Sequence, residues 1–505
     1  MSNSRTKNTV RNIIFGTANQ VTSLALSFIS RTIFIKILGA GYLGINGLFS
    51  DLLMMLSMAD LGLGTAMVYS FYKPLAENDH DKITALIAFY RKIYNFIALA
   101  VAIIGLSLIP FLGYIIHLDK AIPFIKVYYL FFLSNTVISY LFVYKTSIID
   151  ADQKNYVVTK YQMLVNICRV VLQSITLLIL KNYFIYLIIQ VFSSLINNLI
   201  ASKKADELYP YIKKSNHTLD QAEKKSIYAN MKSIFLYKIS GVLLNGTDNT
   251  LISILVGTIW VGVYSNYNLV IIALNNFVNI IYSSATASIG NLIVNEKPKK
   301  RFEIFQSMQA ISFIISTFST VCLYILFNNL IYVWLGTKFI LNNYILAAII
   351  ANFYFGSVIH PIWSYREATG LYMQTKYIMI IAAIENLILS IIMGNLMGMS
   401  GILFASLIAR LTTYFWYEPN LLFKTYFYEP VKKYYITLII NAVLTIFIIA
   451  IINVFTNHII IDSWLKLITK TILVALVTLA IIIPFYYRTS GFKLLLNKIK
   501  TLPDR

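Results

Sequence analysis

Residues 156–163 read YVVTKYQM, and residues 372–379 read YMQTKYIM. Both stretches place Tyr, Thr-Lys-Tyr and Met at the same positions, and each opens a long apolar run. Residues 39–44 and 257–262 are separated by nearly the same distance along the chain, and each has Gly at both ends around an aromatic residue. Two matches with nearly equal offsets predict that the chain contains two copies of one repeat.

Long apolar runs surround these repeats. The 505 residues are 58% hydrophobic and 12% charged, whereas a soluble protein carries about 25% charged residues. Runs of about 20 apolar residues can each cross a bilayer core. We therefore expect an all-α polytopic membrane protein with about fourteen transmembrane helices, which excludes a soluble enzyme and a disordered scaffold. The predicted spans are 12–37, 41–72, 84–116, 123–149, 155–180, 183–202, 228–256, 259–293, 302–330, 339–364, 372–394, 399–422, 434–456 and 464–487.

The repeat divides these spans into two lobes. Six spans separate equivalent positions, so the two six-helix repeats have parallel topology. Parallel repeats related by an axis along the membrane normal are typical of transporters, with a substrate site between the repeats. The expected organisation is an N-terminal six-helix lobe at 1–202, a cytoplasmic linker at 203–227, a C-terminal six-helix lobe at 228–425, and two extra C-terminal helices with a basic tail at 426–505.

The basic residues predict the orientation of the chain. A net charge of +21 on a soluble protein would indicate a nucleic-acid partner. Here most Lys and Arg residues, including Arg366 and Lys376, fall on alternate predicted loops, which is the pattern of a cytoplasmic face. We expect a multi-pass protein of the plasma (cytoplasmic) membrane with both termini in the cytoplasm, and no nucleic-acid partner.

Several kinds of site are not expected. The only long hydrophilic stretch, at about 203–227, is too short for a nucleotide-hydrolysing domain, and the chain has no glycine-rich phosphate loop ending in Lys-Ser or Lys-Thr. Cys168 and Cys322 both fall inside apolar runs and are expected to be core residues, since neither a disulfide nor a metal pair is indicated. We predict no catalytic residues, no metal and no cofactor, and transport driven by an ion gradient or by the gradient of the substrate.

Ionisable residues inside predicted spans are the main candidates for function, because such groups are costly in a membrane. In the repeat, position 31 corresponds to Asn249, beside Asp248, and Arg169 corresponds to Glu385. The cations could form a wet vestibule for an anionic ligand, or opposite charges could pair and hold the repeats together. We expect Arg31 and Asp248 to face one another across a cavity between the repeats. Candidate substrate-binding cations are Arg31, Arg169, Lys238 and Arg410, and candidate coupling or gating residues are Asp51, Asp60, Asp248 and Glu385.

Two further predicted spans contain residues of possible functional or structural importance, namely three asparagines in one span and a proline in the other. Asn268, Asn275 and Asn279 fall on one face of a helix, where they could contact sugar hydroxyls or hold neighbouring helices together. His360-Pro361 predicts a kink inside its span.

Three stretches carry a resemblance to a known family. They are Arg31-Thr32 followed by LGAGYLG at 38–44, ADLGLGTA at 59–66, and the echo from Asp248-Asn249 to Gly262. In these the chain resembles the oligosaccharide flippases of the multidrug/oligosaccharidyl-lipid/polysaccharide exporter superfamily, particularly the Wzx-type flippases of Gram-positive capsule systems. The resemblance implies export of undecaprenyl-diphosphate-linked oligosaccharide units, with Arg31 inheriting the contact to the diphosphate. It also implies a polymerase and glycosyltransferases of the same pathway as partners.

The hypothesis is therefore a flippase that moves a lipid-linked oligosaccharide from the inner to the outer leaflet by alternating access, without covalent chemistry. A teichoic-acid precursor flippase or a lipid II flippase of the same fold is the nearest alternative. A drug antiporter is less favoured, because cationic drugs prefer an acidic cavity. A membrane glycosyltransferase or polymerase would need a long outer loop, and a structural scaffold would not need charges at repeat-equivalent positions.

Overall fold

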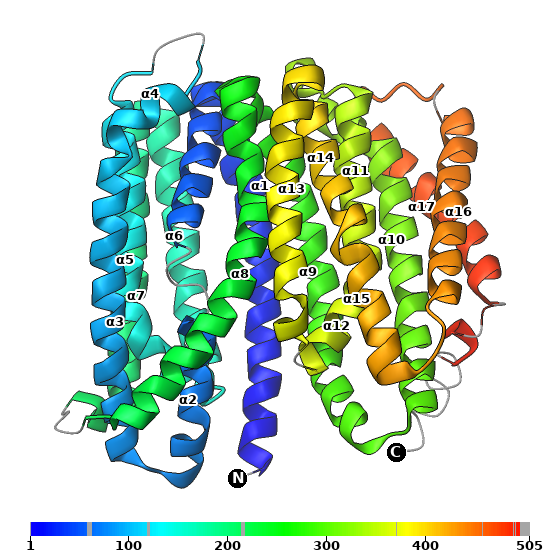
Figure 1. Ribbon diagram of the computed structural model, residues 1–505. Helices are drawn as coiled ribbons and strands as arrows, with labels where there is room; N and C mark the ends of the chain where they lie inside the picture. The colour runs from blue at the N-terminus through cyan, green and yellow to red at the C-terminus, as the bar shows by residue number, and fades with distance from the viewer. Residues whose placement is uncertain are drawn as a thin grey trace. The chain divides into compact units, whose positions relative to one another are not determined.

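The computed structural model describes residues 2–57, 63–118, 122–213, 218–369, 371–456, 458–487, 489 and 491–494. All regular secondary structure in these ranges is helical (Figure 1). The chain forms two compact units that meet in the sequence between Gly262 and Val263. The predicted division into lobes at the 203–227 linker is based on the sequence repeat and stays a prediction.

The first unit contains helices up to the start of α9. Its elements are α1 (Ser2–Leu56), α2 (Leu63–Glu77), α3 (His80–Ser107), η2 (Ile109–Phe111), α4 (Leu112–Ile115), α5 (Ile125–Ala151), α6 (Tyr156–Leu180), α7 (Tyr183–Leu208), η3 (Pro210–Lys213) and α8 (Gln221–Leu255).

Helix α9 (Thr258–Asn295) begins in the first unit and continues into the second. The second unit then contains α10 (Pro298–Leu335), η4 (Thr337–Phe339), α11 (Asn343–Val358), α12 (His360–Thr369), α13 (Tyr372–Met397), α14 (Met399–Thr412), α15 (Tyr414–Leu422), the π-helical η5 (Phe423–Phe427), α16 (Lys432–Thr456) and α17 (Trp464–Tyr487).

The predicted fold class is confirmed, because the chain is an all-α polytopic membrane protein. Among the described residues, nine helices are long and apolar enough to cross a membrane, and the bent pair α11 and α12 raises this number to ten. The remaining predicted spans correspond to α2, α8, α9 and the pair α14 and α15. The bend between α11 and α12 is 44° and falls at His360, which confirms the predicted kink.

A glycine turns the chain inside α1. Gly39 has φ 84° and ψ 178°, so it joins two helical stretches that correspond to the first predicted span and the start of the second. Positive φ is accessible to Gly at little cost, whereas a side chain at this position would be strained. The stretch before Gly39 packs along α6 through contacts such as the hydrogen bond from the Tyr156 N–H to Asn12 Oδ1, and the stretch after it packs against α8.

The two glycine stretches of the repeat meet in the first unit. An added Cβ at Gly44 would lie 2.0 Å from the carbonyl oxygen of Thr258, and one at Gly262 would lie 2.3 Å from that of Ala40. Gly44 is equivalent to Gly262 in the repeat, and Ala40 is equivalent to Thr258. This reciprocal contact is what a local two-fold relation between the two stretches produces, so the glycine match reflects the packing of the backbone.

The start of α9 is also held by hydrogen bonds. The Thr258 backbone N–H donates to the carbonyl oxygen of His117 at 2.8 Å, and the His117 N–H donates to Thr258 Oγ1 at 2.9 Å. The Ser253 hydroxyl lies 2.7 Å from Thr258 Oγ1 and donates to the carbonyl oxygen of Ile115 at 2.7 Å. The residues after α4 therefore fix the backbone that Gly44 approaches.

In the second unit, buried polar contacts join α16 to α10 and α11. The hydroxyls of Thr317 and Thr445 lie 2.9 Å apart, and Asn441 Nδ2 donates to the Tyr354 hydroxyl at 2.8 Å. Buried side-chain hydrogen bonds of this kind hold transmembrane helices together. The first of the two C-terminal helices is therefore an integrated part of this unit.

Substitution of Gly44 by Ala should destabilise the protein. The new methyl group would overlap the Thr258 carbonyl, and overpacking of this kind costs about 1–3 kcal/mol. The expected result is a lower melting temperature of the detergent-solubilised full chain. The control is Gly16→Ala, where no atom lies within 4 Å of the added Cβ, and where we expect no loss. Equal melting temperatures for Gly44→Ala and the wild type would contradict the close backbone contact.

Candidate functional site

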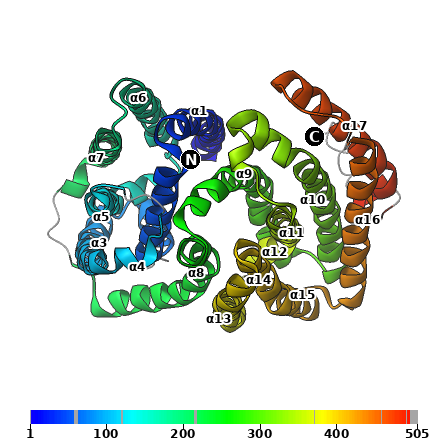
Figure 2. The same cartoon turned by 90° about the horizontal axis from the view of Figure 1, so that it is seen from above.

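A basic site lies inside the first unit, where α1, α6 and α7 run side by side (Figure 2). Arg31 on α1 and Arg169 on α6 are both close enough to act electrostatically on the hydroxyl of Tyr186 on α7. The side chain of Tyr186 is buried and bonds to Ser30, which precedes Arg31. We call the set Arg31, Arg169 and Tyr186 the arginine site.

Arg169 is held in place by neutral groups. Its Nη2 donates to Asn166 Oδ1 at 2.5 Å, and Asn166 Nδ2 donates to Ser23 Oγ at 3.3 Å. The Arg169 Nε is buried without a hydrogen-bond partner, and within the described ranges Arg169 forms no ion pair with a carboxylate. Arg169 is partly buried, and a cation withdrawn from water without a counter-charge is costly, so this guanidinium is suited to receive an anion.

Aromatic rings pack beside the arginine site. Phe34 lies edge-on to Tyr186 at 5.3 Å between ring centroids, and Tyr183 lies 5.1 Å from Tyr42 and 4.8 Å from Tyr128. These rings come from α1, α5 and α7. Because the rings displace water, electrostatic interactions at the guanidinium groups are stronger than in bulk solvent.

Two of the predicted carboxylates of the first unit, Asp51 and Asp248, lie beside or on α8. Asn249 Nδ2 donates to Asp51 Oδ2 at 2.6 Å, so the residue equivalent to Arg31 contacts a carboxylate on α1. Asp248 is the neighbour of Asn249 on α8, and its placement opposite Arg31 stays a prediction. Lys238 lies on α8, and its side chain is outside the described part of the structure. Asp60 also lies outside the described residues.

The second unit contains a buried ion pair. Arg366 Nη1 on α12 lies 2.6 Å from Glu418 Oε1 on α15, and the two side chains are 7% and 1% exposed. The sequence placed Arg366 on a basic loop, which is wrong, because a carboxylate more than fifty positions away compensates its charge inside the unit. The Arg366 guanidinium also lies 5.8 Å from the Trp363 ring, and that ring lies 5.1 Å from His360.

The two other predicted charged residues of this unit, Arg410 and Glu385, both interact with nearby polar side chains. Arg410 on α14 and Arg366 both act electrostatically on the Tyr414 hydroxyl, so they belong to one cluster with Glu418. Glu385 Oε1 on α13 accepts a hydrogen bond from Thr412 Oγ1 at 2.6 Å. In the second unit Glu418 therefore compensates the buried Arg366, whereas Arg169 in the first unit has no carboxylate partner among the described residues.

The three asparagines lie on helix α9 as expected, with Asn268 and Asn275 partly buried and Asn279 exposed. Their contact with substrate stays a prediction. Within the described ranges, no group of three or more His, Cys, Asp or Glu side chains is arranged to hold a metal ion.

An apolar pocket of about 330 Å³ lies in the second unit between α9, α10 and α17. Its walls include Val270 of α9, Leu326 of α10 and Leu467 of α17, and no charged residue lines it. The free thiol of Cys322 forms part of the same wall. The pocket is suited to hydrocarbon.

Sequence reasoning did not identify Tyr186, Asn166 or Glu418. Tyr186 is one of 36 tyrosines, and nothing in its local sequence separates it from those that pack against lipid. Glu418 was overlooked because it stands next to Pro419 near the end of a predicted span, where a charged residue is unremarkable.

Comparison with solved structures shows the fold. The chain superposes on "Lipid II flippase MurJ, inward closed conformation" with a TM-score of 0.65 and 17% identity, covering 94% of this chain and 100% of that one. It superposes on an inward-facing multidrug resistance MATE family transporter of the MOP superfamily with a TM-score of 0.61 and 13% identity, covering 80% and 96%. A Vibrio cholerae MATE transporter, VcmN, gives 0.57 and 13%, covering 85% and 100%.

These identities establish a likeness of fold. No protein-family model matches the chain, and no curated protein matches it. The chain therefore has the helical membrane fold of flippases and multidrug transporters, over nearly its whole length.

Removal of one partner from the Arg366–Glu418 pair should be strongly destabilising. Glu418→Leu removes the carboxylate that pairs with the buried Arg366 guanidinium, for which we expect a loss of about 3–5 kcal/mol. The double variant Arg366→Met with Glu418→Leu should recover most of this loss, because apolar replacements of a buried pair are often tolerated.

The matched control is Asp462→Asn, which removes a 2.7 Å ion pair to Lys466 whose side chains are 56% and 52% exposed. Thermal unfolding should show a change of under about 1 kcal/mol for this variant. A Glu418→Leu protein that melts like the Asp462→Asn protein would contradict the burial of the Arg366–Glu418 pair.

Proposed function

We propose that the protein is a flippase that moves an undecaprenyl-diphosphate-linked oligosaccharide from the inner to the outer leaflet of the plasma membrane, for capsular or exopolysaccharide synthesis. The observation that carries the proposal is the arginine site, where Arg169 has no carboxylate partner among the described residues. The likeness of fold to a lipid II flippase supports the same class of transport.

The chemistry of the arginine site suits a diphosphate. Guanidinium groups donate paired hydrogen bonds to phosphate oxygens, and such charge-assisted bonds are about twice as strong as neutral ones. The unpartnered Nε of Arg169 and the hydroxyl of Tyr186 supply further donors beside Arg31. An anionic head group would therefore lower the cost of keeping these cations out of water.

The lipid portion of the substrate needs an apolar surface. The pocket between α9, α10 and α17 has walls without charged residues and a volume of about 330 Å³, so it can receive isoprene units. We propose that the polyprenyl tail contacts this pocket or remains in the bilayer while the sugars pass through the protein.

Transport of this kind needs no covalent chemistry, so we propose that the protein is not an enzyme. Alternating access would expose the arginine site first to one side of the membrane and then to the other. The candidate residues for ion coupling or gating are Asp51, Asp60, Asp248 and Glu385. The hydrogen bond between Asp51 and Asn249 would respond to protonation of Asp51. We keep Lys238, Arg410 and the asparagines Asn268, Asn275 and Asn279 as further candidate contacts to substrate.

The substrates of the nearest alternative transporters would also carry a diphosphate. A lipid II flippase or a teichoic-acid precursor flippase would use the same arginine site, and the sugar unit would distinguish them. A multidrug antiporter is less favoured, because two guanidinium groups repel cationic drugs. We also propose that both termini lie in the cytoplasm and that glycosyltransferases and a polymerase of the same pathway act as partners.

Loss of either arginine should impair flipping. A charge-assisted hydrogen bond is worth about 1.5–3 kcal/mol, which corresponds to roughly a ten- to hundredfold loss of affinity. We expect this loss for Arg31→Ala and for Arg169→Gln, measured as flipping of a fluorescent undecaprenyl-diphosphate sugar in proteoliposomes. Asn275→Ala should have a smaller effect.

The matched control is Lys36→Ala, which removes an exposed cation from the same helix as Arg31. It should flip the lipid at the wild-type rate. Wild-type rates for both arginine variants, with verified insertion, would show that the diphosphate is anchored elsewhere.

A further inference from the structure

The start of α8 is a polar segment that lies against the start of α3. Residues 221–232 read QAEKKSIYANMK, which is more polar than the rest of the helix. Figures 1 and 2 show that this part of α8 runs obliquely across the start of α3 before the helix continues along the first unit. The rings of Phe89 on α3 and Tyr228 on α8 meet edge-on at 5.6 Å.

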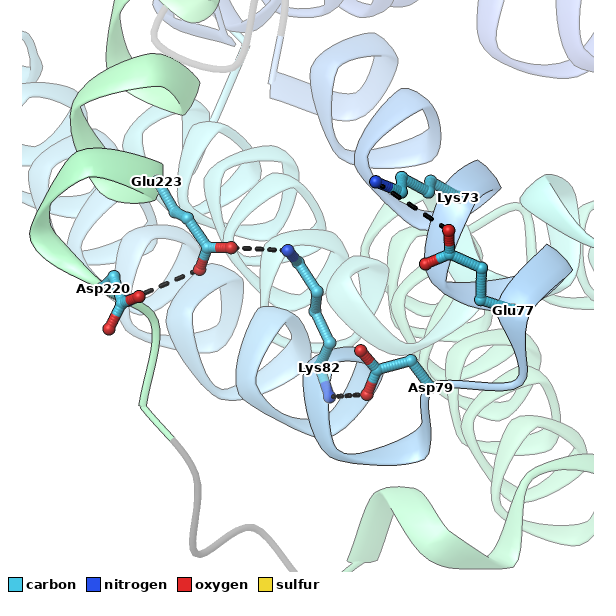
Figure 3. A network of polar contacts seen from close by, with 6 residues as sticks. All are labelled: Lys73, Glu77, Asp79, Lys82, Asp220 and Glu223. Carbon is cyan, nitrogen blue, oxygen red and sulfur yellow. Dashed lines mark hydrogen bonds and ion pairs between the residues drawn. The ribbon is translucent and has the colours of Figure 1, made fainter.

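A polar network fastens this segment to α3 (Figure 3). The Lys82 ammonium donates to Glu223 Oε1 at 2.5 Å, and Glu223 Oε2 accepts from the Asp220 backbone N–H at 3.4 Å. On the other side, Asp79 caps α3 by accepting from the Lys82 backbone N–H at 2.9 Å. The hydrogen bond from Lys82 holds the pKa of the Glu223 carboxyl below its usual value, so the Lys82–Glu223 ion pair is charged at neutral pH.

A pocket of about 490 Å³ opens beside this ion pair. Aromatic rings line it next to two lysines, so apolar surface lies beside a cationic rim. Its principal lining residues are Phe89, Lys92 and Phe96 of α3, Leu219 just before α8, and Lys224 and Tyr228 from the start of α8. Phe96 is 70% exposed and Tyr228 is 51% exposed, so the apolar wall is open to whatever surrounds the protein.

The position of Lys92 in the sequence places this pocket at the membrane boundary. Lys92 is the last charged residue before Asp119, and the intervening residues form the apolar part of α3 and the segment that follows it. A lysine at such a boundary directs its ammonium toward the head groups while its stem covers apolar surface. The wall formed by Phe96 lies one helical turn further into the apolar part of α3 and therefore faces acyl chains.

We propose that this pocket binds an anionic phospholipid of the surrounding leaflet. The lipid phosphate lies between the ammonium groups of Lys92 and Lys224, and one acyl chain covers Phe89, Phe96 and Tyr228. Glu223 does not compete for these lysines, because Lys82 already neutralises it. The pairing of two cations with an exposed apolar wall at head-group depth matches a lipid rather than a soluble anion.

Bound lipid would connect α8 to the bilayer. Since α8 continues to Asp248 and Asn249, a lipid that fixes its start also fixes the orientation of the helix that contacts Asp51. The proposal concerns a site separate from the arginine site, and it stands whether or not the transported substrate is an oligosaccharide.

Native mass spectrometry of the detergent-purified full chain tests the proposal. The probes are phosphatidylglycerol and phosphatidylcholine with identical acyl chains. Each lysine near an anionic lipid contributes about 1 kcal/mol, so the wild type should retain phosphatidylglycerol about ten- to thirtyfold better. In Lys92→Gln with Lys224→Gln this preference should fall to about one.

The matched control is Lys432→Gln with Lys433→Gln, which neutralises two exposed lysines at the start of another apolar helix. It should keep the full preference, and all proteins should melt alike in phosphatidylcholine. Equal retention of both lipids by the wild type would overturn the proposal, as would an unchanged preference in Lys92→Gln with Lys224→Gln. If this variant lost retention of undecaprenyl diphosphate but kept that of phosphatidylglycerol, the pocket would belong to the substrate, and the proposal would be wrong.

Discussion

Close contact between backbones at two equivalent glycines is the constraint on which the first unit depends. Gly44 and Gly262 each leave room for a carbonyl oxygen that a side chain would displace. The turn at Gly39 sends the first stretch of α1 along α6 and the second along α8. The arginine site follows from this turn, because Arg31 can approach Arg169 only if the stretch before Gly39 packs on α6. A reciprocal contact between repeats thus determines where the charges of one repeat can lie.

Arg366 in the second unit and Arg169 in the first unit have different kinds of partner. In the second unit, Glu418 compensates Arg366, and such an ion pair, once desolvated, is sensitive to loss of either partner. In the first unit, Arg169 is held by the amide of Asn166, which positions the guanidinium but does not neutralise it. An amide partner keeps the cation available for an anionic ligand, whereas a carboxylate partner would compete with that ligand. This difference separates a candidate binding group from a structural one.

Hydropathy and the repeat predicted the helical fold, since both depend on local composition and on spacing along the chain. The kink at His360-Pro361 was predictable for the same reason, because Pro removes a backbone donor from its own helix. Burial of Arg366 was not predictable, since its partner Glu418 is distant in sequence and approaches it only through packing of α12 on α15. Arg31 and Arg169 were both recognised as intramembrane cations, but their convergence on Tyr186 required the packing of α6 and α7. Asp60 and the side chain of Lys238 lie outside the described part of the structure.

The central claim is that Arg169 recognises a phosphate of the transported lipid, and a thermodynamic cycle tests it most directly. Binding of an undecaprenyl-diphosphate sugar and of the corresponding monophosphate would be measured for the wild type and for Arg169→Gln in the same detergent. We expect the wild type to bind the diphosphate roughly ten- to hundredfold more tightly than the monophosphate, and Arg169→Gln to bind the two nearly alike. The same preference for the diphosphate in both proteins would show that Arg169 does not contact the phosphates, and would contradict the claim.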